Sequence, residues 1–438
     1  MKSIRISLIL IHVLVLVGCG NNSGVDSPEG KDEFAATKSE MFAVALPAPA
    51  AEIASLQLTP EQEQFVKSGN DFALRLLSSV YEESGSSFVL SPISVQYAMG
   101  MALNGSAGET AGEITSALGF GEDLSAMNAY CRTLLEQLSA LDFDVKLKMA
   151  DALIMKDSYS LSETARERIE SNYYAPVVAV SFGKAGGVMT LVNDWFQRST
   201  EGLFPSIVDD LSPQAVSYLL SGIYFKAGWL GPYTDVPGKV PFYADGEVLQ
   251  LDYIEKSYAP LCVDLADCRL VSFALGKGKF VLNLILPTDG YSLSDVLSSL
   301  TEARVTEALS SRGYKASHIM LPAFTTESSL SLKSALETCG IEKAFDGKRA
   351  DFSTIVSEPG FYIDDVLHKA KLSWDKNGTT GADPVQVPMA IPSEPGAPEE
   401  VEEEELLVNR PFAYFISEYN NLAERFGAIL FAGVFDGK

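Results

Sequence analysis

Hydrophobic residues in the first half of the chain recur at the 3.6-residue period of amphipathic helices. The segment that begins with Thr59 and Pro60 shows this clearly, because Thr caps a helix well and Pro fits the first turn. A second apolar helix is expected after Ser91, over residues 92–103. Further helical patterns cover residues 111–118, 126–138, 162–171 and 189–199.

From about residue 215 the pattern changes to short apolar runs bounded by Gly, Pro and Asn, which is typical of β-strands. The expected strands are residues 223–225, 279–286, 319–324, 412–416 and 429–434. Helices early and strands late predict an α+β fold, in which the early helices pack on large antiparallel β-sheets.

The N-terminus has the pattern of an export signal. A basic start precedes an apolar run over residues 6–17, which is shorter than the roughly 20 residues that cross a bilayer. The run leads into Leu-Val-Gly-Cys, which resembles the bacterial lipobox and predicts lipidation of Cys19; an incidental Cys after an ordinary signal peptide is the alternative. The expected organisation is a signal peptide at 1–18, a flexible tether at 19–58 and a single domain at 59–438. We therefore expect an exported protein, lipid-anchored at the bacterial cell envelope, at the outer membrane or surface.

Composition and charge narrow the function classes. Apolar residues form 47% of the chain and charged residues 21%, which favours a large folded core over disorder. The formal net charge of −25 argues against nucleic acid as a partner and against a basic membrane-binding face. Cys262 and Cys268 are near enough in sequence to close a small loop, whereas Cys131 and Cys339 fit core positions. No metal-type spacing occurs, and no cofactor is expected.

Short motifs from about residue 60 to the C-terminus resemble, in order, segments of the serpin family. The most informative are FVLSPIS at 88–94, IYFKAGW at 223–229, VLHKA at 366–370 and NRPF at 409–412. The resemblance implies the serpin fold, with an exposed reactive-centre loop after the His-Lys-Ala strand. It also implies a mechanism: a peptidase cuts the loop, the N-terminal half of the loop inserts into the central sheet as a new strand, and the acyl-linked peptidase is trapped.

The resemblance also implies roles for individual residues. The implied hinge comprises Lys376, Gly378, Thr379, Thr380, Gly381 and Ala382. The implied shutter, which holds the sheet closed, comprises Ser91, Ser94, Ser221 and His368. The implied reactive centre comprises Met389, Ala390, Ile391, Pro392 and Ser393. The customary spacing puts the scissile bond at Pro392-Ser393, and a small shift in register would move it to Met389-Ala390 or Ala390-Ile391.

Three positions depart from the family pattern. Ser221 replaces the usual Asn of the shutter, although a hydroxyl can still bond the imidazole of His368. Lys376 replaces a Glu that usually faces a Lys at the position of Ala323. Neither partner of that contact is kept.

The loop sequence contains features that favour insertion and features that oppose it. Strand alternation puts Thr379 and Gly381 on the core side, where small residues fit. Asp383 would be a buried carboxylate, and Pro384 and Pro388 lack the N–H that a central strand donates. Slow insertion would turn an inhibitor into a mere substrate.

The loop also limits the target. No Lys or Arg lies between Lys376 and Arg410, so we expect a serine- or cysteine-type peptidase that is elastase-like, subtilisin-like or otherwise accepts small or apolar residues, and not a trypsin-like one. The acidic run at 399–405 is expected to be solvated loop padding, with electrostatic steering of a basic peptidase as the alternative.

Catalysis is not expected. The chain after Cys19 has two histidines, His318 and His368, and neither lies near a nucleophile elbow or a paired metal ligand. Two functions stay open. One is a monomeric peptidase inhibitor of the suicide-substrate type, and the other is a non-inhibitory serpin that serves as a cell-surface binding or structural protein.

Overall fold

The helices of the first half begin close to where their caps predict. In the computed structural model, which describes residues 42–182, 185–244, 246–257, 261–311, 313–379, 401–419 and 426–438, the first helix is α2 (Pro60–Ser84). Thr59 accepts a hydrogen bond from the Gln62 amide at its start, and Gly85 ends it in a left-handed conformation. It is followed by α3 (Pro92–Gly105), α4 (Gly108–Leu118), α5 (Leu124–Leu138), α6 (Glu163–Tyr173) and α7 (Ala185–Ser199).

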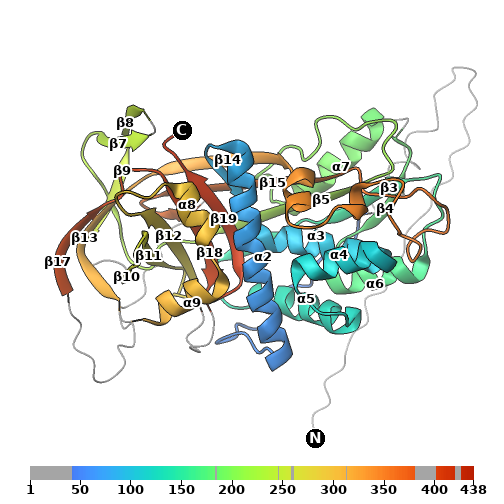
Figure 1. The fold of residues 1–438 in the computed structure, drawn as a ribbon, viewed down its shortest axis with the longest axis horizontal. Helices are drawn as coiled ribbons and strands as arrows, with labels where there is room; N and C mark the ends of the chain where they lie inside the picture. Colours follow the sequence, from blue (N-terminus) through green and yellow to red (C-terminus); the bar gives the residue numbers. More distant parts are fainter. Residues whose placement is uncertain are drawn as a thin grey trace, which may run out of the picture. The chain divides into compact units, whose positions relative to one another are not determined.

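Ten strands form the larger sheet, which Figure 1 shows on the side of β10, β13 and β17. In sheet order, nine of them are β1 (Phe88–Leu90), β19 (Ile429–Phe435), β18 (Phe412–Glu418), β12 (Phe280–Pro287), β11 (Cys268–Leu275), β10 (Leu261–Asp264), β13 (Tyr314–Pro322), β9 (Tyr253–Ser257) and β6 (Thr234–Asp235). The tenth, β17 (Val401–Leu407), pairs in parallel with β13. The second half of the sequence also contains three short helices and a separate hairpin. The helices are α8 (Leu293–Ser299), α9 (Glu302–Ser310) and α10 (Lys333–Thr338), and the hairpin consists of β7 (Val240–Ala244) and β8 (Glu247–Leu251).

The second sheet positions the functional residues. Its order is β14 (Phe324–Ser331), β15 (Asp365–Asp375), β5 (Ser217–Lys226), β3 (Ala152–Lys156) and β4 (Val177–Val180), with β16 (Gly378–Thr379) on β15 and β2 (Lys146–Met149) on β5. The expected order of helices early and strands late is therefore incomplete, because β1 to β4 lie among the helices. The strand expected at 319–324 is also wrong: it spans the end of β13 and the start of β14.

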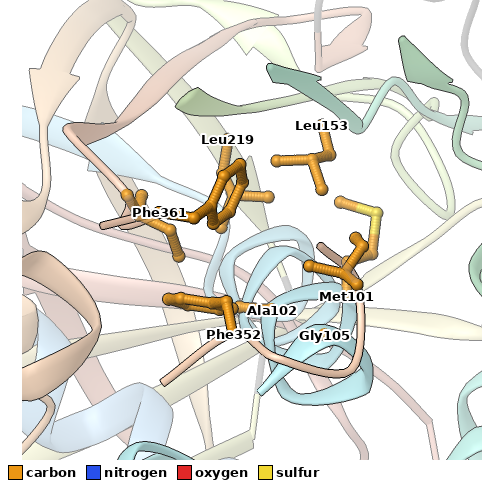
Figure 2. A pocket seen from close by; sticks show the side chains of 9 residues that line it. Met101, Ala102, Gly105, Leu153, Leu219, Phe352 and Phe361 are labelled. Atoms are coloured by element: carbon orange, nitrogen blue, oxygen red, sulfur yellow. The ribbon is translucent and has the colours of Figure 1, made fainter. Parts of the chain in front are cut away.

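The second sheet separates two apolar clusters. Ile154 and Leu220 pack with α7 on one face, and Leu153 and Leu219 face α3 on the other, as strand alternation requires. On the α3 side these two leucines border a cavity of about 10 Å³, into which Phe352 and Met101 also point (Figure 2). A space of this size is a packing defect and no ligand site.

The observed architecture confirms the predicted α+β fold with helices on large, mostly antiparallel sheets. One exception to the antiparallel order matters for function. Strands β5 and β15 are parallel neighbours, paired from Tyr218 with Asp365 to Gly222 with Lys369.

Candidate functional site

The structure brings the four implied shutter residues together at the junction of β5 and β15. Ser91 caps α3 and Ser94 lies in its first turn, while Ser221 on β5 stands directly opposite His368 on β15. All four are buried, and a fifth polar side chain, Asp151, joins them from the position directly before β3. We call Ser91, Ser94, Asp151, Ser221 and His368 the polar cluster.

Hydrogen bonds in the polar cluster form a directed chain. The Ser91 amide donates to Nε2 of His368 over 2.9 Å, so Nε2 carries no proton. In the neutral ring the proton therefore sits on Nδ1 and is donated to Ser221 Oγ, 3.1 Å away. Ser221 Oγ is 2.7 Å from Ser94 Oγ. The Ser94 hydroxyl donates to Oδ1 of Asp151 over 2.8 Å, where the chain ends.

Burial shifts the two titratable groups of the polar cluster in opposite directions on the pH scale. Loss of hydration lowers the pKa of His368 to about 3, so the ring is neutral at physiological pH. Loss of hydration raises the pKa of Asp151 to about 7, although the hydroxyls of Ser94 and Ser221 counteract part of this shift. Both groups disfavour a buried charge.

Sequence reasoning missed Asp151 as a site residue. The available signal was an acidic residue directly before four apolar strand residues, Ala152 to Met155, since such a carboxylate needs hydrogen-bond partners.

The polar cluster joins the two strands between which a new strand would have to enter. Neighbouring strands lie about 4.8 Å apart, so an inserted strand would separate His368 from Ser221 by that additional distance. The bond between their side chains and the backbone pairing of residues 218–222 with 365–369 would both be lost. This arrangement can therefore hold the sheet closed.

Beyond Asp375, the chain reverses and returns as β16 between β15 and the segment after β5. Gly378 pairs with Asp375 and bridges to Gly228, while Thr379 pairs with Trp374. The Thr379 amide donates to the Ala227 carbonyl over 2.7 Å, and the Ala227 amide donates to Oγ1 of Thr379 over 2.9 Å. Thr379 is fully buried, on the core side that alternation predicts. We call Gly378 and Thr379 the loop start.

Only glycine fits at position 378. Its φ is +136°, and a Cβ atom would lie 2.4 Å from the Ala227 carbonyl oxygen. The neighbouring residue Lys376 forms an ion pair with Asp235 of β6, with Nζ and Oδ2 2.5 Å apart. Lys376 thus has a partner of its own in place of the Glu–Lys contact that is usual in the family.

The other predicted site residues lie outside the described part of the chain. These are Cys19, Thr380, Gly381, Ala382, Met389, Ala390, Ile391, Pro392 and Ser393. Residues 401–405 of the acidic run are described, and the expectation of loop padding is wrong for them. They belong to β17, whose backbone pairs with β13 and whose end buries Leu406.

Other candidate chemistry is accounted for by the fold. His318 on β13 bonds Glu255 of β9, with Nε2 and Oε2 3.1 Å apart. Cys262 and Cys268, like Cys131 and Cys339, are buried and form no disulfide, so the small disulfide loop does not form. Among the described residues, no three His, Cys, Asp or Glu side chains are grouped to hold a metal. None of the described helices combines the length and apolarity that crossing a membrane requires.

Comparison with known proteins agrees with this geometry. Iripin-8 of Ixodes ricinus is 28% identical over 348 residues, which cover 76% of this chain and 85% of that protein. Serpin B9 of Homo sapiens is 26% identical over 330 residues, or 73% of this chain and 88% of that protein. The crystal structure of Serpin48 from the insect Tenebrio molitor shares the fold, with a TM-score of 0.73 at 23% identity over 87% of this chain and 100% of that one.

The family assignment rests on the length of chain that a single family model explains. The model described as Serpin (serine protease inhibitor) matches residues 67–436, which include both sheets, the polar cluster and the loop start. The chain therefore belongs to the serpin family.

Proposed function

We propose that this serpin is a suicide-substrate inhibitor of peptidases that accept small or apolar residues. Serpins in general are protease inhibitors and not enzymes. The observation that carries the proposal is the loop start: Thr379 already pairs with Trp374 of β15 on one side and with Ala227 on the other. Insertion of the rest of the strand would continue a pairing that has begun.

Energetics favour insertion up to a limit. Each new backbone hydrogen bond contributes about 1 kcal/mol net, and buried apolar side chains add to it. Opposing it are Asp383, Pro384 and Pro388, together with the cost of parting His368 from Ser221. If these costs dominate, the loop is cut without trapping, and the protein is a non-inhibitory serpin that serves as a cell-surface binding or structural protein.

Loop composition supports the target class. The absence of Lys and Arg between Lys376 and Arg410 favours elastase-like or subtilisin-like enzymes over trypsin-like ones. The proposed scissile bonds are Pro392-Ser393, Met389-Ala390 and Ala390-Ile391. We further propose that the protein acts as a monomer at the bacterial cell envelope, held there by lipid on Cys19.

Incubation with an elastase-like, a subtilisin-like and a trypsin-like peptidase tests the proposal. We expect an SDS-stable complex with one of the first two, and a released C-terminal peptide whose mass identifies the cut within residues 389–393. Trypsin serves as the control and should give no complex. Loop cleavage with neither a complex nor a gain in thermal stability would contradict the inhibitor proposal and favour the non-inhibitory alternative.

A further inference from the structure

The segment before α2 is attached to the domain at both of its ends. Residues 42–58 belong to the stretch that the sequence predicts to be a tether, and the boundary at residue 59 stays a prediction. Phe42 is only 6% exposed. Its ring stacks on Trp195 of α7, with centroids 5.1 Å apart and planes inclined by 29°.

The other end of the segment is bound by polar contacts. The Ile53 amide donates to the Ala140 carbonyl, just beyond α5, over 2.9 Å. Oε1 of Glu52 accepts hydrogen bonds of 2.7 Å from the Phe143 amide and from Nζ of Lys277, in the turn between β11 and β12. The segment therefore runs between two fixed points, of which one is α7.

Helix α7 covers the part of the sheet that would have to open. Trp195 packs beside Phe196, with ring centroids 6.0 Å apart. The Phe196 ring lies directly on Gly222 of β5, because a Cβ atom there would be 2.3 Å from Cζ of Phe196. Gly222 and Lys369 are the last pair that joins β5 to β15.

We propose that residues 42–58 form a strap that holds α7 on the central sheet through Phe42 and thereby slows separation of β5 from β15. A strand entering between them would move the strands about 4.8 Å apart, so Phe196 would have to leave Gly222. Displacement of α7 would strain or break the stack of Phe42 on Trp195. The effect of the strap on trapping rests on the proposed function, whereas its contact with α7 does not.

Hydrogen–deuterium exchange of the uncleaved full chain tests the strap. In Phe42→Ala we expect peptides of α7 to exchange about tenfold faster, since an aromatic contact and its buried area are lost. Exchange in α2 should stay unchanged. The matched control is Tyr291→Ala, which truncates a ring that is 47% exposed and lies away from the strap, and it should leave α7 unaffected.

Two results would overturn the strap: exchange in α7 equal to that of the Tyr291→Ala control, or an equal acceleration in α7 and α2. If Phe42→Ala does not fold, Phe42→Leu keeps most of the apolar volume without the ring and should accelerate α7 by a smaller factor.

A second measurement separates the strap from the proposed function. The measurement follows the unfolding temperature with time after loop cleavage. It should increase at a higher rate in Phe42→Ala than in the unaltered protein, because the strap is proposed to slow strand separation. If the unaltered protein gains no stability after cleavage, the inhibitor proposal fails, while the exchange of α7 still decides whether the strap exists.

Discussion

Strands β5 and β15 are joined in different ways at two positions along their length. Near Trp374, at what we call the open level, the strand β16 lies beside β15, and its contacts are made by backbone groups and the small side chains of the loop start. Near His368, at what we call the closed level, β5 and β15 pair directly, and their junction contains buried polar groups on one face and Phe196 on the other. The comparison shows where resistance to insertion is concentrated: at the polar cluster and under α7, and not where the loop begins.

The largest expected effect concerns how the polar cluster, at the closed level, makes the free energy of unfolding depend on pH. The pKa of Asp151 is raised from 3.8 to about 7, so the folded state binds its proton more tightly than the unfolded state, and this stabilising contribution is lost as pH rises from 4 to 7. The pKa of His368 is lowered from 6.5 to about 3, so its contribution changes oppositely and falls as pH drops from 6.5 to 3. The two slopes oppose each other between pH 4 and 6.5.

Asp151→Asn removes the pH dependence that Asp151 contributes and leaves the one that His368 contributes. We expect the free energy of unfolding of this variant, relative to the unaltered protein, to rise with pH by up to about 1.4 kcal/mol per unit between pH 4 and 7. Urea unfolding at several pH values measures it. A difference that does not vary with pH would show that Asp151 does not titrate in this window.

At the open level, Gly378→Ala is expected to have the next largest effect. The added Cβ would collide with the Ala227 carbonyl, and relief of the collision displaces the loop start at a cost of about 2–3 kcal/mol in unfolding free energy. Chemical denaturation measures the loss. Gly290→Ala is the control, because its φ is +91° but no atom lies within 4 Å of the added group. Equal losses in both variants would contradict the collision.

Ser221→Ala should weaken the closed level more modestly. It deprives the Nδ1 proton of His368 of its acceptor, which costs about 1 kcal/mol or somewhat more. Ser217→Ala is the matched control on the same strand, because it removes a bond to the Tyr362 carbonyl without touching β15 side chains. Hydrogen exchange at residues 365–369 should accelerate only in Ser221→Ala. Acceleration in both variants would argue against a specific role of the polar cluster.

The smallest effect is expected for Lys376→Ala at the open level. The ion pair of Lys376 with Asp235 is exposed, with 48% and 61% of the two side chains accessible, and is therefore screened by water and salt. The unfolding midpoint should stay within measurement error, as for Lys239→Ala, which breaks another exposed pair. A clear loss of stability specific to Lys376→Ala would mean that this pair helps to hold the loop start.

Local patterns predicted the elements well where one local signal dominates. Thr59 and Ser91 marked the starts of α2 and α3 because capping depends on neighbouring residues only. The break between β13 and β14 was missed, because the apolar run continues through Pro322 and Ala323 while the backbone changes sheets. The resemblance to serpins named four residues that do meet in the polar cluster, although their role stays a prediction.

By itself, the sequence determined the fold class, the family and the exclusion of Lys and Arg from the loop, because these follow from local periodicity, ordered motifs and composition. Only the tertiary structure decided that Asp151 ends the polar chain, that the Thr379 amide already bonds the Ala227 carbonyl, and that Phe42 reaches Trp195. Each of these contacts joins residues far apart in the chain. Their meeting depends on strand register and packing, for which the sequence carries no local signal.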